Sequence, residues 1–153
     1  MADHGNCMLQ QVDLWAGSNP AALQTALGFA PPEAMGHVVE RNGIRVARIS
    51  TRRYWIIGEL PLLRLHPEVG AVLPLDQGRI SMMLSGAGAR SVLSQLMAID
   101  WDDARAEPGR LVLGAIHRVP VAVLPHAPDR YELLMPRSFA ESLSGLISEI
   151  DRA

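Results

Sequence analysis

The residues of this sequence that could support chemistry are led by five histidines and a single cysteine, Cys7. The histidines are His4, His37, His66, His117 and His126. No two histidines lie three or four residues apart, and none has that spacing from Cys7, although a helix that binds zinc requires it. His117 and His126 lie near the ends of adjacent predicted strands, so they could meet in space. We expect isolated histidines at the surface or on edge strands instead.

Two charged clusters are the next candidates. The acidic cluster consists of Asp100, Asp102, Asp103 and Glu107. It lacks the alternating oxygen ligands and the central glycine of a calcium-binding loop, so we expect a solvated loop in place of a cation site. The basic cluster consists of Arg48, Arg52 and Arg53. It would suit an anion, but we expect ion pairs at a surface or an interface.

One glycine-containing turn resembles the start of a nucleotide-binding motif. Residues 85–90, Ser-Gly-Ala-Gly-Ala-Arg, follow a predicted strand and open a predicted helix, as in a dinucleotide fingerprint. Ser91 occupies the place of the third glycine, and no parallel strand–helix–strand unit is indicated elsewhere. We therefore expect a tight turn that needs small residues. The sequence assigns no catalytic, cofactor-binding or metal-binding residue to this chain.

Length and composition exclude several classes of protein. The chain has 153 residues, of which 48% are hydrophobic and 20% charged, and its formal net charge is −2. The high apolar fraction excludes a disordered chain. The slight negative charge excludes a basic nucleic-acid-binding module, although all fourteen basic residues are arginines. The single cysteine excludes a disulfide within the chain.

The same features predict a location. Residues 1–6 lack the positive charge and the apolar stretch of a signal peptide. No apolar run reaches the roughly 18 residues that a membrane-spanning helix needs. We therefore expect a cytoplasmic protein with neither a membrane nor a nucleic acid as its partner. The mean hydropathy of +0.12 is high for a small soluble chain, and it raises the question of what covers the apolar residues.

The predicted elements divide the chain in two. Asn19 and Pro20 form a helix start and Gly28 a helix stop, with Leu23, Ala26 and Leu27 at helical spacing between them. This short helix lies in an otherwise loose N-terminal arm, residues 1–42. Residues 43–153 then form a single α+β domain.

The larger part reads as a mainly antiparallel sheet with two main helices. Alternating or continuous apolar runs predict strands at residues 44–49, 54–57, 79–84, 111–116, 119–124 and 131–135. A helical turn is expected within residues 62–65. Apolar residues at helical spacing predict one helix over 89–97. The second main helix follows a capping box formed by Ser138 and Glu141.

Five short pieces within residues 54–146 carry a family resemblance. They are Tyr-Trp-Ile-Ile-Gly-Glu at 54–59, Asp-Gln-Gly-Arg at 76–79 with the strand to 84, Ser-Gly-Ala-Gly-Ala-Arg-Ser-Val-Leu at 85–93, Ile-Asp-Trp-Asp at 99–102 followed by Pro108 and Gly109, and Pro-Arg-Ser-Phe-Ala at 136–140 with Leu143. In order and spacing these pieces resemble the gamma subunit of heterotetrameric sarcosine oxidase and of related N-methyl amino acid dehydrogenases.

The resemblance implies a fold and a role. The fold would be similar to the folate-binding-type N-terminal domain of glycine-cleavage aminomethyltransferases. The role would be that of a non-catalytic assembly (gamma) subunit in a bacterial flavoenzyme of sarcosine catabolism, which oxidatively demethylates an N-methyl amino acid. The partners would be the alpha, beta and delta subunits. This chain would hold no cofactor, whereas FAD, FMN, NAD, tetrahydrofolate and zinc are expected in the partner subunits.

Two further expectations separate this role from its rival. An assembly subunit should expose apolar positions to a larger subunit, and we expect these at Met83, Trp101 and one face of residues 119–124. The rival is a stand-alone folate-binding or one-carbon transferase-like domain. It requires a buried carboxylate placed for the pterin ring, and the sequence does not identify one.

Overall fold

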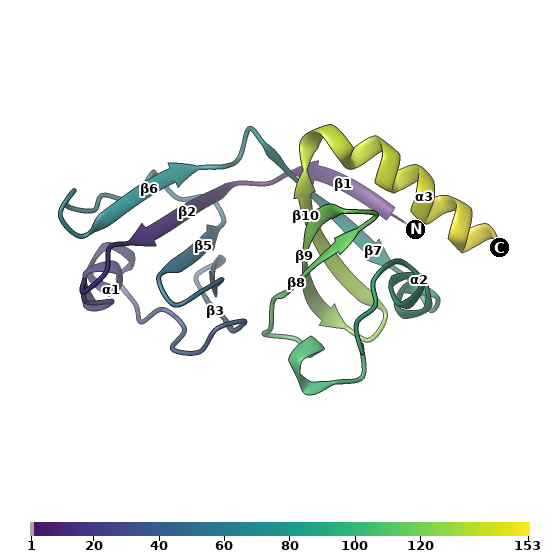
Figure 1. Cartoon of the computed structure of the whole chain (residues 1–153), viewed down its shortest axis with the longest axis horizontal. Coiled ribbons are helices and arrows are strands. Elements are labelled where there is room, and N and C mark those ends of the chain that lie inside the picture. The colour runs from purple at the N-terminus through teal and green to yellow at the C-terminus, as the bar shows by residue number, and fades with distance from the viewer. Residues whose placement is uncertain (1) are drawn as a thin grey trace. The chain divides into compact units, whose positions relative to one another are not determined.

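The computed structural model describes residues 2–153, and these residues form ten strands, three α-helices and two short 3-10 helices (Figure 1). In chain order the elements are β1 (Ala2–Asn6), β2 (Leu9–Leu14), α1 (Ala21–Leu27), β3 (Val38–Arg41), β4 (Ile44–Arg48), β5 (Arg53–Ile57), β6 (Gly70–Pro74), β7 (Arg79–Ser85), α2 (Ala89–Leu96), η1 (Ala104–Ala106), β8 (Val112–Ile116), β9 (Val119–Ala127), β10 (Arg130–Pro136), η2 (Arg137–Phe139) and α3 (Ala140–Arg152).

The chain divides into two compact units. Unit 1 combines residues 2–7 with residues 78–153, and unit 2 is the continuous segment Met8–Gln77. The boundary expected after residue 42 falls inside unit 2, in the turn of the β3–β4 hairpin. Asn42 and Gly43 both have positive φ there, at 52° and 77°. A two-residue hairpin turn of type I′ requires this conformation, which Asn-Gly adopts readily.

Unit 1 is an antiparallel sheet covered on one face by helices. Its strand order is β1-β7-β10-β9-β8, and every pairing within it is antiparallel. Alternate residues of β10, namely Tyr131, Leu133 and Met135, point to the same face because successive side chains of a strand alternate. They join a core with the apolar side of α2 and α3, including Leu93 and Leu143.

Unit 2 is a second antiparallel sheet with its own core. Its strand order is β3-β4-β5-β2-β6. Val12 of β2, Val46 of β4 and Tyr54 of β5 form this core together with Leu23 of α1, and all four are almost fully buried. The α1 helix begins and ends as expected, because Asn19 Oδ1 accepts the Ala21 N–H at 2.9 Å and Gly28 caps the C-terminus at a φ of 87°.

The α+β class is confirmed, but two details differ from expectation. The strands form two sheets where one was expected. Residues 1–42, expected to be a loose arm, contribute three paired strands besides α1: β1 pairs with β7, β2 with β5 and β6, and β3 with β4. These strands mix polar and apolar residues, so they carry weak local signals.

Three local predictions were wrong. No helical turn forms at residues 62–65. Ser138 does not cap α3, because residues 137–139 form a 3-10 turn and the helix begins at Ala140 without a side-chain cap. Trp101 and residues 119–124 do not present an apolar surface. Trp101 is 4% exposed, and within residues 119–124 only Pro120 is exposed.

Candidate functional site

One pocket of unit 1 lies among the start of α2, the loop that follows α2 and the β9–β10 turn. Its volume is about 170 Å³. The residues that line it are Arg90, Trp101, Asp102, Asp103, Ala106, Glu107, Pro108, Pro125, Ala127, Pro128 and Tyr131. We call it the Trp101 pocket. Its walls combine two aromatic rings and three prolines with four charged side chains.

Arg90 and Tyr131 hold this pocket together. The Arg90 Nε–H donates to the Tyr131 hydroxyl at 3.2 Å, and that hydroxyl donates to the Pro128 carbonyl at 3.2 Å. The Arg90 guanidinium also forms an ion pair with Asp102, whose side chain is 79% exposed. These bonds connect the first turn of α2 to the loop after it and to the β9–β10 turn.

Trp101 forms the buried wall of the pocket. Its ring meets the Tyr131 ring edge to face, with centroids 5.6 Å apart and planes at 72°, a favourable geometry for aromatic pairs. Within residues 2–153 its indole N–H has no hydrogen-bond acceptor. A buried donor without an acceptor loses about 1–3 kcal/mol relative to a solvated one, so this group is unusual in a native core.

Carboxylates outnumber cations in the lining of the pocket. Asp103 is paired with Arg105 at 3.0 Å. Hydrogen bonds from the Arg105 side chain and backbone hold the pKa of Asp103 below its usual range. Asp102 is shared with Arg90. Glu107 is exposed, and its carboxylate forms no hydrogen bond or ion pair with any other residue in 2–153.

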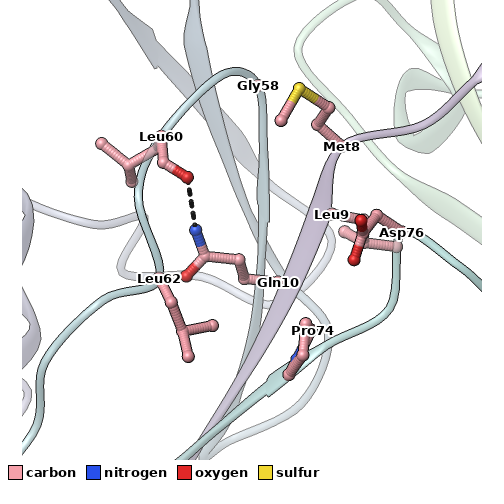
Figure 2. Close-up of a pocket in the computed structure, with 8 residues that line it drawn as sticks. All are labelled: Met8, Leu9, Gln10, Gly58, Leu60, Leu62, Pro74 and Asp76. Atoms are coloured by element: carbon pink, nitrogen blue, oxygen red, sulfur yellow. Dashed lines mark hydrogen bonds between the residues drawn. The ribbon is translucent and has the colours of Figure 1, made fainter.

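Unit 2 contains a second pocket of about 180 Å³, shown in Figure 2. The buried side chain of Gln10, on β2, fixes one wall. Its Nε2 donates to the carbonyls of Leu60 and Pro61 at 3.1 and 3.0 Å, and its Oε1 accepts the Leu63 N–H at 2.8 Å. The half-exposed side chains of Met8 and Leu62 also line this pocket.

A buried carboxylate lies on the face of the unit 1 sheet opposite the helices. Glu132 of β10 has only 7% of its side chain exposed. One oxygen accepts from the Ser81 hydroxyl at 2.9 Å, and the other lies 2.9 Å from Nε2 of His126. Each oxygen thus has a partner from a neighbouring strand, β7 or β9.

His117 and His126, which were predicted to be able to meet, do not lie together. His117 lies in the β8–β9 turn with a φ of 47°, at the opposite end of β9 from His126. His126 instead pairs with Glu132, which the sequence did not indicate. The sequence missed this pair because Glu132 occupies an otherwise continuous apolar strand, where its burial depends on two neighbouring strands.

The basic cluster forms local contacts. Arg53 pairs with Asp13 of β2 at 2.7 Å, as expected for a surface ion pair. Arg48 donates to the carbonyls of Glu33, Ser50 and Thr51, and its guanidinium lies 5.4 Å from the centroid of the Tyr54 ring. Arg48 therefore ties neighbouring loops to the sheet.

The glycine-containing run at residues 85–90 is a tight turn between β7 and α2. Gly86 has a φ of 123°, which L side chains rarely adopt. Its N–H donates to the Asp129 carbonyl at 2.9 Å. The neighbours of β7 are antiparallel, whereas the dinucleotide fold requires a parallel unit. Cys7 is buried and is not part of a disulfide within the described residues.

The acidic loop is held by its own backbone. The Asp100 side chain accepts the Asp102 N–H at 3.0 Å, and Asp103 accepts the Arg105 N–H at 2.8 Å. In the part of the chain that the structure describes, no three His, Cys, Asp or Glu side chains are grouped to hold a metal ion. None of the helices there has the length and apolar character that crossing a membrane would demand.

The fold is that of an α+β protein with two antiparallel sheets and three α-helices, and solved structures share it. The chain is similar to a chain in the structure of heterotetrameric sarcosine oxidase from Corynebacterium sp. U-96 in complex with pyrrole 2-carboxylate. The identity is 21% and the TM-score 0.79, covering 99% of this chain and 84% of that one. No protein-family model matches the sequence, and no curated protein matches it.

A second similar structure is glycine cleavage system aminomethyltransferase T from Bartonella henselae. The identity is 12% and the TM-score 0.62, and the alignment covers 95% of this chain and 45% of that one. This chain therefore spans about half the length of the transferase. Both structures agree with the fold that the sequence resemblance implied.

Proposed function

We propose that this chain is a non-catalytic assembly subunit, of the gamma type, in a heterotetrameric sarcosine-oxidase-type flavoenzyme. The observation that carries the proposal is the extent of the structural likeness. It spans nearly the whole of this chain and 84% of a chain from such an oxidase. A shared fold over nearly all of this chain and most of that one favours a shared place in an assembly more than a short common motif would.

Exposed apolar side chains support the proposal. Among the residues whose exposure the structure describes, 5–153, seven large hydrophobic residues are 44–61% exposed: Met8, Trp15, Met35, Leu62, Leu73, Leu113 and Phe139. Single exposed apolar residues are ordinary on a soluble protein. Here, however, Met8 and Leu62 share one pocket (Figure 2). Such a hollow with apolar sides suits burial against a partner chain.

The proposal assigns the chemistry to other chains. Alpha, beta and delta subunits would carry the FAD, FMN, NAD, tetrahydrofolate and zinc, and the complex would oxidise an N-methyl amino acid in a bacterial cytoplasm. The contribution of this chain would be to bind and order its partners. Its removal should therefore reduce the yield or stability of the complex before it changes the chemical step.

Co-expression tests the proposal directly. A tagged copy of the full chain is produced together with alpha, beta and delta subunits of a sarcosine-oxidase-type complex. The purified material is analysed by gel filtration with absorbance at a flavin wavelength. We expect one complex in which this chain and flavin elute together. A monodisperse monomer that leaves all those subunits in the unbound fraction would overturn the proposal.

A stand-alone folate-binding or one-carbon transferase-like domain is the second candidate, and one observation favours it. The buried carboxylate of Glu132 is the kind of group that binding a pterin ring would need. Calorimetric titration of the purified chain with tetrahydrofolate tests this candidate. Binding that is lost in Glu132→Gln favours the transferase-like domain, whereas no heat in the wild type leaves the assembly subunit.

A further inference from the structure

The unit 1 sheet ends at β8, an edge strand without the features that usually protect an edge. Within residues 2–153 the edge strands are β1 and β8 of unit 1 and β3 and β6 of unit 2. β3 contains Glu40 and Arg41, β6 ends at Pro74, and β1 has the sequence Ala-Asp-His-Gly-Asn. Charges and prolines of this kind keep an edge from pairing with another chain. β8 has the sequence Val-Leu-Gly-Ala-Ile, with neither a charge nor a proline.

The β8–β9 turn fixes which backbone groups of β8 are already paired. The turn residues, His117 and Arg118, both have positive φ, at 47° and 69°, and Ile116 pairs with Val119 on either side of them. In a two-residue hairpin of this kind the flanking residues exchange two hydrogen bonds, and every second pair along the strands does the same. Alternate residues of β8, counted back from Ile116, therefore bond to β9.

The other two residues of β8, Leu113 and Ala115, direct their N–H and C=O groups away from β9. No residue in 2–153 forms a hydrogen bond with these four groups. Leu113 is 51% exposed, and Ala115 is exposed as well. Only an extended backbone offers donors and acceptors at the matching spacing, so the edge is a template for one more strand.

The rest of β8 is fixed against the core of unit 1. Ile116 is fully buried in that core, and Val112 packs against it. Gly114 lies so close to the Met97 side chain that a Cβ there would collide with it. Since side chains alternate along a strand, Leu113 projects from the opposite face. A partner would thus meet an edge that is already formed and would not have to order it.

The charge around the edge is positive at the turn. Residues 108–128 contain the whole β8–β9 hairpin and no aspartate or glutamate. Before β8, the charge of Arg110 is offset in part by Asp103, and exposed Glu107 lies in the same loop. After β8, exposed Arg118 forms no ion pair with any residue in 2–153.

Neighbouring elements of unit 1 keep that sign. Toward the same end of the sheet, β7 begins at Arg79, η2 begins at Arg137 and the first turn of α3 contains Glu141. Two cations and one carboxylate add to the unpaired charge of Arg118. A segment that carries a carboxylate at this end would therefore be attracted to the edge.

We infer that β8 pairs with an extended segment of a partner subunit, which adds a sixth strand to the five-stranded sheet of unit 1. The backbone of that segment bonds to Leu113 and Ala115, an apolar side chain packs on Leu113, and a carboxylate lies beside Arg118. This inference rests on the proposed assembly function, because it names the contact that one partner would make.

A second copy of this chain fits the edge less well. In an antiparallel pair of two β8 strands, bonding Leu113 of one copy to Ala115 of the other places Arg110 opposite Arg118 at both ends. Like charges directly opposite each other destabilise a strand pair. The charge pattern thus favours a different chain as the partner.

Hydrogen–deuterium exchange with single-residue resolution tests the pairing on the wild type. The full chain is measured alone and in its complex with alpha, beta and delta subunits of a sarcosine-oxidase-type enzyme. We expect the amides of Leu113 and Ala115 to exchange at least tenfold more slowly in the complex, and Gly114 to be protected in both states. Glu40 has the same place in the β3–β4 hairpin as Ala115 has here, and its amide serves as the unchanged reference.

Two proline variants test the same contact by mutation. Ala115→Pro removes an outward N–H and keeps the bonds to β9, and Glu40→Pro does the same at the β3 edge. We expect Ala115→Pro to recover at least tenfold less complex after dilution and Glu40→Pro to match the wild type. Circular dichroism checks that both variants fold.

A charge variant serves if Ala115→Pro does not fold. Arg118→Asn removes the cation, and asparagine adopts the positive φ of this turn readily. It should weaken the complex roughly two- to fivefold, the range of one exposed ion pair. Arg130→Asn removes an exposed arginine at the other end of the sheet and should have no effect.

The outcomes separate the inference from the proposed function. If the wild type forms the complex but Leu113 and Ala115 gain no protection, the inference fails while the subunit role stands. If the chain alone shows protection of these amides that disappears on dilution, a second copy is the occupant and the inference is overturned. If the wild type binds none of the subunits, the proposed function fails, and this inference fails with it.

Discussion

Replacing Gln10 should destabilise unit 2 more than an isosteric change of one side chain normally does. The Gln10 amide makes three hydrogen bonds to the segment at residues 60–63. In Gln10→Leu the carbonyls of Leu60 and Pro61 lie near the surface and can turn to water, whereas the N–H of buried Leu63 cannot. The Leu63 donor therefore dominates the cost.

The magnitude follows from these three groups. A buried donor left unpaired costs about 1–3 kcal/mol, and each of the two other bonds contributes about 0.5–1.5 kcal/mol net. The larger apolar side chain recovers roughly 1 kcal/mol by burial. We expect a loss of about 2–4 kcal/mol. For a chain of this length this corresponds to a fall in Tm of about 5–15 °C.

Thermal unfolding followed by circular dichroism measures this loss, and hydrogen exchange at the Leu63 amide locates it. Gln24→Leu is the matched control, because Gln24 lies exposed on α1 in the same unit. The control should change Tm by less than about 2 °C. A Gln10→Leu protein that melts within 2 °C or so of the wild type would refute the argument that these bonds fix the 60–63 segment.

The stability of a Gln10→Glu variant should depend on pH for the same structural reason. The new carboxylate would face the carbonyls of Leu60 and Pro61, which oppose its negative charge, so its folded-state pKa should rise above the unfolded value of about 4.3. The protonated acid can still donate a hydrogen bond. The stability of this variant should therefore be greatest below about pH 4 and decline as the pH rises through the raised pKa.

Three further predictions follow from single contacts. Gly70→Ala should lower the free energy of unfolding in urea by about 1–3 kcal/mol, since a Cβ there would lie 2.3 Å from the Asp13 carbonyl oxygen. Gly145→Ala, in an open position of α3, should raise it by about 0.5–1 kcal/mol. The opposite order would contradict the close approach of β2 and β6. Burial raises the pKa of Asp13, but the hydrogen bonds from Arg53 and Gln11 together lower it by more than burial raises it. The pKa of Asp13 therefore lies below its usual value. Arg53→Gln should therefore lower stability by less than about 1 kcal/mol above pH 4 or so, and the difference should vanish as the pH falls through the pKa of Asp13; a difference that grows in acid would exclude this pair. Trp101→Phe removes no hydrogen bond, so we expect a loss of about 1–2 kcal/mol, and a loss as large as the roughly 3–5 kcal/mol of a Trp→Ala change would reveal a hidden acceptor.

Elements with strong local signals were predictable from the sequence. The α1 helix has a polar N-terminal residue at Asn19 and a glycine at its C-cap, and both act through bonds to the nearest backbone. The strand at residues 79–84 and the helix at 89–97 show clean periodicity, and both appear at nearly those bounds. Their apolar faces point into one core, so the local pattern and the packing agree.

Elements that depend on partners distant in the sequence were not predictable. β1 reads Ala-Asp-His-Gly-Asn, with little strand propensity, and it becomes a strand by pairing with β7. β6 begins at Gly70 because only a residue without a Cβ fits against the Asp13 carbonyl. Neither the pairing nor the close approach can be seen in a local window of sequence.

The sequence also predicted only part of the candidate site. The sequence singled out the pieces at residues 85–93 and 99–102, but it placed Trp101 on the surface, where the structure buries it. The four carboxylates of the acidic loop were expected to act alike. In the structure Asp100 and Asp103 bond to the loop itself, Asp102 pairs with Arg90, and Glu107 faces solvent.

The discontinuity of unit 1 sets the order in which the chain can fold during synthesis. Unit 2 is continuous and leaves the ribosome complete, so it can fold while β7 is still being made. β1 is synthesised before unit 2, yet β7, the strand it pairs with, follows the whole of unit 2. β1 must therefore wait without its partner strand until β7 is made, and its docking then closes a loop as long as unit 2 itself. A folded unit 2 shortens that loop, because loop closure costs entropy only for flexible chain.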